Sequence, residues 1–285
     1  MGGAADVVAR TIGQKLGESF GQQIIIDNRT GAATIVASSI AAKAAPDGYT
    51  LFMQDITTHA FNASLYKKLP FDPVKDFAAV TLVASTPQVL VCNPSLPIKS
   101  VGDLIEMARD KPGQLNLAFG GTGSGAHLAG ELLKMMANIK LTHVPYKGGA
   151  LAMTDLISGQ VQLLFYSLPG AMPQIKAGKI RAVAVTSIKR AGAAPEIPTV
   201  AESGIAGYEV TTYIGLLAPA ATPKRIVGKL NAEVLQALHS PDVAQAISRQ
   251  GLDLLGSTQA DFEKHLKSDL AKWSKVIRAA DLHPD

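Results

Sequence analysis

The segment Asn116–Glu131 constrains the fold most, because it joins an apolar run to a helical pattern through a cluster of glycines. It reads NLAFGGTGSGAHLAGE, with glycines at positions 120, 121, 123 and 125. Apolar residues alternate before the glycines, as in a strand, and Ser124 can cap a helix that buries Leu128 and Leu132. A strand that passes directly into a helix is the repeating unit of α/β folds.

The glycine loop itself predicts an anion-binding turn. The first amides of a helix have no acceptor within the helix, and the positive end of its dipole favours a carboxylate or phosphate. Glycine permits positive φ and lets an anion approach the backbone closely. We therefore expect Gly121, Thr122, Gly123 and Ser124 to contact a ligand. The alternative is a plain tight turn between a strand and a helix.

Strands and helices alternate along most of the remaining chain, which indicates an α/β fold. The expected strands are 23–27, 49–53, 78–92, 115–119, 141–144, 161–165, 181–186 and 208–218. The expected helices are 4–20, 33–44, 101–109, the segment after Ser124, the stretches that end at 157 and 177, and much of 222–285. In the last of these, Phe262 and Trp273 recur at helical spacing and are predicted to be core residues.

The two long strands, 78–92 and 208–218, bracket a block of strand–helix units. We interpret them as a double hinge between two lobes. Lobe I would comprise residues 1–91 and 213–285, and lobe II residues 92–212, with a ligand cleft between them.

Other polar residues are predicted to adjoin the ligand because they follow strands or precede a helix. Gly2 and Gly3 precede the first helix, whose first turn contains Asp6. The remaining candidates follow the strands 49–53 and 161–165, where ligand-reading loops lie in α/β sheets, and they are Thr57, Thr58, His59, Tyr166 and Ser167. For His59 and His127 a structural, fully hydrogen-bonded ring is the alternative interpretation.

Composition and motifs argue against several other functions. The net charge of +4 comes without a basic cluster interleaved with aromatics, so we expect no nucleic-acid partner. Cys92 is the single cysteine, which excludes an intrachain disulfide, and the six histidines lack metal-ligand spacing, so no metal is predicted. The sequence has neither a P-loop nor a G-x-S-x-G motif. Ser124 and His127 lack an identified acid to orient them as a nucleophile and base.

One enzyme class remains as the alternative. Gly121–Ala126 fits the loose dinucleotide pattern G-x-G-x-x-A between a strand and a helix. The next expected strand, however, ends without the acidic residue that would hold a ribose. A Rossmann-type nucleotide-dependent enzyme is therefore the second hypothesis, after a binding protein that needs only glycine- and hydroxyl-rich loops.

Stretches along the whole chain resemble the Bug-type solute receptors of tripartite tricarboxylate transporters. They include GGAADVVAR, DNRTGA, KAAPDGYTL, YKKLPFDPVKDFAAVTL, NPSLPIKSVGDLI, HLAGELLKMMA, HVPYKGG, RAVAVTS, IPTVAESGIAGYE and GLLAPAATP. The resemblance implies a two-lobed periplasmic binding protein of type II (a Venus flytrap) that holds a small mono- or dicarboxylate without catalysis or cofactor. It also implies transient partners in the membrane subunits of a transporter. We further expect a monomer.

The resemblance places the same ligand loops at Gly2, Gly3 and Asp6, at Thr57–His59, at Gly121–Ser124 and at Tyr166–Ser167. Members of the family are expected to carry an acid and an amide at the last loop, so Tyr166 and Ser167 argue against recognition of an amino group. The family also begins with a signal peptide and a strand before the first glycines. We therefore expect export to the periplasm and an upstream strand that this sequence does not include.

Overall fold

The computed structural model describes residues 4–29, 31, 34–121 and 123–282. The predicted ligand residues Gly2, Gly3 and Thr122 lie outside these ranges. The chain forms two compact units: unit 1 comprises Met1–Ser85 and Thr212–Lys275, and unit 2 comprises Thr86–Thr211 and Val276–Asp285.

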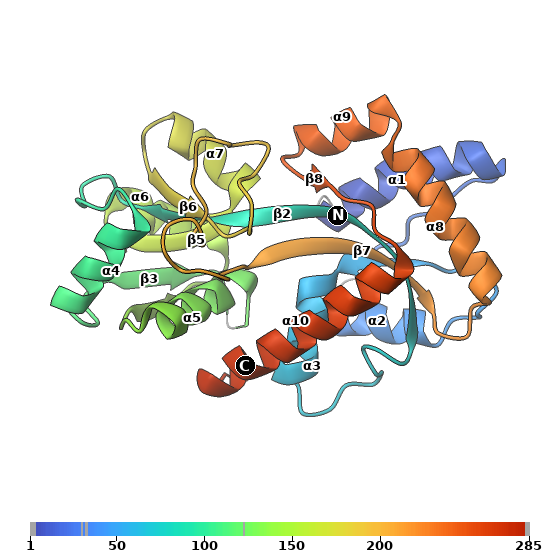
Figure 1. The fold of residues 1–285 in the computed structure, drawn as a ribbon, viewed down its shortest axis with the longest axis horizontal. Helices are drawn as coiled ribbons and strands as arrows, with labels where there is room; N and C mark the ends of the chain where they lie inside the picture. Colours follow the sequence, from blue (N-terminus) through green and yellow to red (C-terminus); the bar gives the residue numbers. More distant parts are fainter. Residues whose placement is uncertain (1–3, 30, 32–33, 122, 283–285) are drawn as a thin grey trace. The chain divides into compact units, whose positions relative to one another are not determined.

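Unit 1 is a small sheet with helices on both faces (Figure 1). Its strands are β1 (Phe52–Asp55), most of β7 (Thr211–Pro219), the first part of β2 (Phe77–Cys92) and β8 (Asp253–Leu254). β1 pairs antiparallel with β7, and β8 pairs antiparallel with β2. One face carries α1 (Ala4–Phe20), α8 (Lys224–Leu238) and α9 (Pro241–Arg249); the other carries α2 (Ile35–Ala42), α3 (Ile56–Leu65) and α10 (Gln259–Ala279).

The core of unit 1 forms where the predicted apolar faces of these helices meet the strands. α1 buries Val8, Ile12 and Leu16, which recur every four residues and so lie on one face of the helix. Phe262 and Trp273 of α10 are fully buried, which confirms their prediction as core residues.

Unit 2 contains a mixed sheet of five strands. β5 (Leu163–Ser167), β3 (Asn116–Phe119) and β4 (Thr142–Pro145) run parallel, and the second part of β2 is antiparallel to both β5 and β6 (Arg181–Val185). The helices are α4 (Val101–Asp110), α5 (Gly125–Ala137), α6 (Gly149–Ser158) and α7 (Leu168–Lys176).

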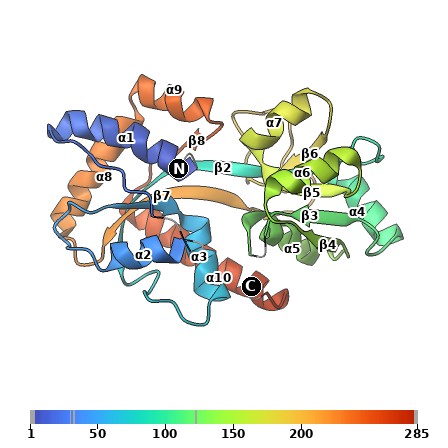
Figure 2. The ribbon, with the colours of Figure 1, turned by 180° about the vertical axis from the view of Figure 1, so that it is seen from behind.

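The helices of unit 2 cover opposite faces of its sheet. Ala118 of β3 packs with α6 and α7, whereas the neighbouring Leu117 lies against Gly130 of α5. Successive strand residues point to opposite faces, so this pair places α5 on one side and α6 and α7 on the other, as Figure 2 shows. α4 lies at the expected helix 101–109, and Ser100 and Asp103 form a capping box at its start.

Two local predictions are wrong. Residues 23–27 are not a strand; among the described residues no strand pairs with them, and Ile25 is 83% exposed. A β-favouring sequence cannot form a strand without a neighbour to receive its hydrogen bonds. Residues 56–59 are not a loop but the first turn of α3, because the Asp55 side chain caps that helix.

Candidate ligand-binding site

Helix N-termini gather at one edge of the sheet in unit 2. The parallel strands β5, β3 and β4 end at the same edge, and each leads into a helix. α7 begins at Leu168 directly after β5, α5 begins at Gly125 after the glycine loop, and α6 begins at Gly149 after a short turn. Their positive dipole ends and first-turn amides therefore share this edge, which favours an anion.

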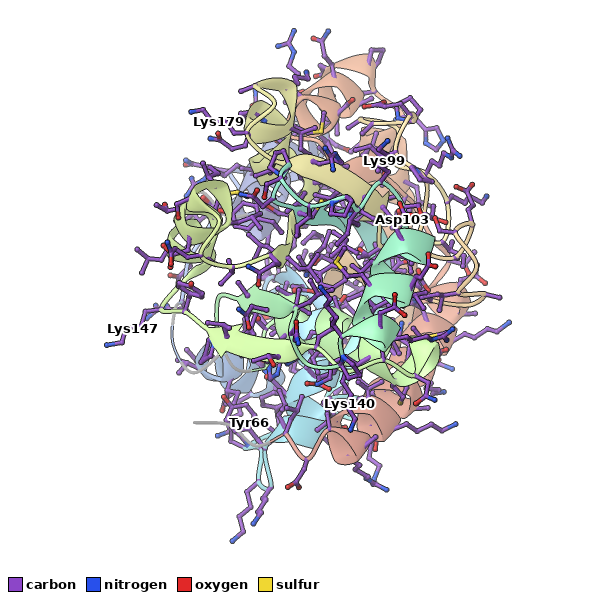
Figure 3. The ribbon with its side chains drawn as sticks, turned by 90° about the vertical axis from the view of Figure 1, so that its left-hand side faces the viewer. Tyr66, Lys99, Asp103, Lys140, Lys147 and Lys179 are labelled. Carbon is purple, nitrogen blue, oxygen red and sulfur yellow. The ribbon has the colours of Figure 1, made fainter. Side chains whose placement is uncertain are left out.

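Glycines allow the loops at this edge to touch. A Cβ on Gly120 would lie 2.5 Å from the amide nitrogen of Gly149, and a Cβ on Gly149 would lie 2.7 Å from the ring of Tyr166. The exposed side chain of Lys147, in the turn between β4 and α6, projects outward from unit 2 (Figure 3). The glycines therefore bring backbone groups of neighbouring loops together at this edge, and Lys147 does not point into it.

Two glycines of the loop have the predicted positive φ, but some of the loop amides already have acceptors. Gly121 and Gly123 have positive φ, at 140° and 72°, and Ser124 caps α5 by accepting the N–H of His127 at 3.3 Å. The Gly123 N–H donates to His127 Nδ1 at 3.1 Å, and the Ser124 N–H donates to the Gly121 carbonyl at 3.1 Å. Of the described first-turn amides of α5, those of Gly125 and Ala126 remain, and helix geometry gives them no acceptor inside the helix.

Ser167 and Tyr166 lie at the same edge, at the end of β5. Ser167 is exposed and occupies the cap position of α7 without a side-chain cap bond. The Tyr166 ring fits between Gly149 and Gly170, where a Cβ on either glycine would meet it at 2.7 Å. Contact of Ser167 and Tyr166 with a ligand stays a prediction.

Gln88 of β2 is a site candidate that sequence reasoning missed. It is the cross-strand partner of Ser167, and its Nε2 would lie 2.6 Å from a Cβ on Gly125. Its Oε1 is buried and has no hydrogen-bond partner among the described residues. The available signal was a lone amide between Pro87 and the apolar run VLVC.

In unit 1 the predicted hydroxyls of Thr57 and Thr58 serve the structure. Asp55 accepts the backbone N–H groups of both threonines, and the Thr58 hydroxyl donates to Asp55 Oδ2 at 2.7 Å. Desolvation raises the pKa of Asp55, although the Thr57 and Thr58 donors oppose it. The Thr57 hydroxyl accepts the N–H of Tyr213 at 3.2 Å. The start of α3 is thus already capped by the Asp55 side chain.

His59 has the contacts of a structural histidine. It is 1% exposed, its Nδ1 pairs with Gln54 Nε2, and its Nε2 lies 2.9 Å from the carbonyl oxygen of Pro73. Its ring stacks on Phe71 and meets Phe77 edge-on. Burial lowers the pKa of His59, against the hydrogen bond to Pro73 that raises it, so the ring is neutral at neutral pH.

Asp6 braces the start of α1. Its Oδ1 lies 2.9 Å from Nε of Arg10 and accepts the side-chain N–H of Asn28 at 2.7 Å. These bonds join the first turn of α1 to the segment that follows residue 27. A direct role of Asp6 in ligand contact stays a prediction.

His127, Glu131 and His143 form a cluster that sequence reasoning also missed, although His127 and Glu131 are four residues apart on a helix. One donor atom from each lies within 4.8 Å of the others, as a metal site would require. A metal-bound histidine normally donates its other ring N–H to an acceptor. Here His127 Nδ1 instead receives the Gly123 N–H, and the Lys134 ammonium already binds Glu131 at 2.9 Å. The residues therefore do not fit a metal ion.

Known proteins are similar to this chain over nearly its whole length. A 38% identical relative, a UPF0065 protein in the tcbD-tcbE intergenic region of Pseudomonas sp. (strain P51), aligns over 97% of this chain and 82% of its own length. BugT of Bordetella pertussis is 32% identical and aligns over 97% and 85%. Among the described helices, none is long and apolar enough to span a membrane.

Several solved structures are similar to this chain in both sequence and fold. Rpa4515 of R. palustris, solved with adipate, is 38% identical with a TM-score of 0.81 and coverage of 98% of this chain and 94% of the other. MatC of Rhodopseudomonas palustris, solved with bound malate, is 31% identical with a TM-score of 0.77 and coverage of 97% and 95%. BugD is 30% identical, with a TM-score of 0.78 and coverage of 100% and 96%.

The fold is therefore that of a two-lobed periplasmic binding protein of type II, in which β2 and β7 pass between the units. Within that class, the chain belongs to the tripartite tricarboxylate transporter family receptor proteins, whose family model matches residues 8–282. This confirms the resemblance to Bug-type receptors. Members of the family are solute-binding receptors.

Proposed function

We propose that this protein captures a small mono- or dicarboxylate and presents it to the membrane subunits of a tripartite tricarboxylate-type transporter. The observation that carries the proposal is the gathering of the N-termini of α5, α6 and α7 at one sheet edge. Amides and dipoles there suit a carboxylate without a cationic side chain. The adipate and malate named for two structural relatives support the same ligand class.

The ligand would lie between lobe I (1–91 and 213–285) and lobe II (92–212). The boundaries between the two compact units support this division, because they lie at 85–86 in β2 and at 211–212 in β7. In the proposal, Ser167, Gly121 and the first-turn amides of α5 supply contacts from lobe II. Asp6 and Thr58 support those from lobe I. The buried His59 supports the start of α3 through its contact with Gln54 of β1.

The protein would act in the periplasm as a monomer and without catalysis. The family description supports the receptor role, and the periplasmic binding protein BugD supports the periplasmic location. The alternative, a Rossmann-type nucleotide enzyme at Gly121–Ala126, receives no support from the next strand, because β4 reads THVP and carries no acid for a ribose.

Thermal-shift measurements would test the proposal with malate, succinate, adipate and acetate on one side and NAD, NADP and ATP on the other. We expect at least one carboxylate to raise the melting temperature and the nucleotides to leave it unchanged. Stabilisation by a nucleotide alone would contradict the proposal. Calorimetry on Ser167→Ala, with Ser203→Ala as a control, would then locate the site. The Ser203 hydroxyl donates to the Thr199 carbonyl at 2.7 Å and should not affect affinity.

A further inference from the structure

The side chain of His127 contacts the backbone of the glycine loop. The Gly123 N–H donates to His127 Nδ1 at 3.1 Å. A backbone N–H can only donate, so Nδ1 must carry a lone pair and the neutral ring must carry its proton on Nε2. The ring is held for this contact: it is 5% exposed and stacks on Phe119, with ring centroids 4.1 Å apart and planes 6° apart.

An anion behind the ring favours the same tautomer. His127 Nε2 faces Glu131 Oε1 at 3.8 Å, and that oxygen also receives His143 Nδ1–H at 2.8 Å and the Lys134 ammonium at 2.9 Å. Burial would raise the pKa of Glu131, but the bonds from His143 and Lys134 outweigh it and lower the pKa to about 2. Glu131 is therefore an anion at neutral pH, and it attracts a proton to Nε2 of His127.

We propose that His127 is a positioning residue for the ligand loop: in its neutral form it fixes Gly123, and a second proton on Nδ1 releases the loop and weakens carboxylate binding. The inference rests on the proposed function for its affinity readout. A protonated ring would present Nδ1–H to the Gly123 N–H, and two donors at this distance cannot form a hydrogen bond. Gly123 adjoins Ser124, the cap of α5, so the loss reaches the amides at the start of that helix.

The side chains that face His127 come from three elements. Within the described residues, its own helix contributes Glu131, with Lys134 beyond it, and β4 contributes His143, whose ring centroid lies 5.0 Å away. The strand β3 contributes the uncharged ring of Phe119. Variants at position 127 alter only His127 among these groups, so a pH effect that disappears in them belongs to His127.

Two substitutions at position 127 each reproduce the hydrogen bonding of one ring nitrogen. In His127→Asn the amide oxygen can take the place of Nδ1 and accept the Gly123 N–H, whereas in His127→Gln the amide can reproduce only the Nε2 side. Neither variant titrates, and both lose the stacking on Phe119, so any general loss of stability is shared. At pH 7.5 we expect His127→Asn to bind the best carboxylate of the thermal-shift panel about three- to tenfold more tightly than His127→Gln.

Calorimetry between pH 7.5 and 5.5 gives the second readout. The wild-type affinity should fall by about three- to tenfold toward pH 5.5, and the affinity of His127→Asn should stay level. Equal affinities of the Asn and Gln variants would overturn the proposal. So would a wild-type affinity that is constant or rises on acidification, or a fall that persists in His127→Asn and so originates elsewhere.

A measurement without ligand separates this inference from the proposed function. Long-range ¹H–¹⁵N spectra of histidine-labelled protein should show His127 protonated on Nε2 alone at pH 7.5, and the Gly123 amide proton should shift when the ring gains its second proton. A ring protonated on Nδ1 at pH 7.5 would refute the inference even if carboxylates bind. If the spectra are as expected and no carboxylate binds at any pH, the proposed function fails and the His127–Gly123 contact stands.

Discussion

Gly120→Ala tests the close approach of two loops at the proposed ligand edge. The new Cβ would lie 2.5 Å from the amide nitrogen of Gly149 and 3.0 Å from the carbonyl carbon of Gly148. Both neighbours are backbone atoms, which cannot rotate aside as a side chain can. The turn before α6 must therefore move by about 1 Å to reach an ordinary contact distance.

The expected cost is that of overpacking, about 1–3 kcal/mol in the free energy of unfolding. This corresponds to a fall in melting temperature of about 2–4 °C for each kcal/mol. The displacement of the turn before α6 would also move the Gly149 amide away from a bound carboxylate. Loss of one hydrogen bond to a charged group, about 1.5–3 kcal/mol, corresponds to an affinity reduced by about ten- to a hundredfold.

Urea unfolding and calorimetry on the same preparation would measure both effects. The matched control is Gly228→Ala inside α8, where an added Cβ has no atom within 4 Å. That variant should be more stable than wild type by about 0.5–1 kcal/mol, because alanine favours a helix over glycine, and it should bind normally. A Gly120→Ala protein as stable as wild type would refute the steric reasoning.

Three further outcomes follow from individual contacts. Gly123→Val should reduce carboxylate affinity more than Ser167→Ala by calorimetry, because φ of 72° at position 123 strains a β-branched residue; equal, near-wild-type affinities would contradict the loop's role. Burial lowers the pKa of His59, so its contribution to stability is present above its ordinary pKa near 6.5 and is lost as the pH falls below it. Urea midpoints should therefore decrease from pH 7.5 to 5.5 by less in His59→Gln than in wild type, and identical slopes would count against this. Tyr208→Phe removes a buried bond of 2.8 Å from the Tyr208 hydroxyl to the Ala129 carbonyl and should cost about 0.5–1.5 kcal/mol of unfolding free energy, whereas unchanged stability would mean that the bond contributes nothing.

Local chemistry in the sequence was sufficient to predict most helices and the glycine turn. α1 occupies the predicted residues 4–20, and the cap at Ser124 lies where it was expected, because a cap depends on residues within one turn. The positive φ values at Gly121 and Gly123 were predictable for the same reason. Family membership was also readable from the sequence, since the matching stretches run along the whole chain.

Tertiary structure decided what those residues touch. Residues 23–27 have strand-forming side chains but no described partner strand, and pairing is a property of neighbours distant in sequence. Gln88 meets the start of α5 only because β2 lies antiparallel to β5. His127 could be suspected near a loop, but its bond to Gly123 and its shared anion with His143 of β4 depend on how the strand and helix pack. A hydrogen bond of this kind joins groups through space, and spacing along the chain does not specify it.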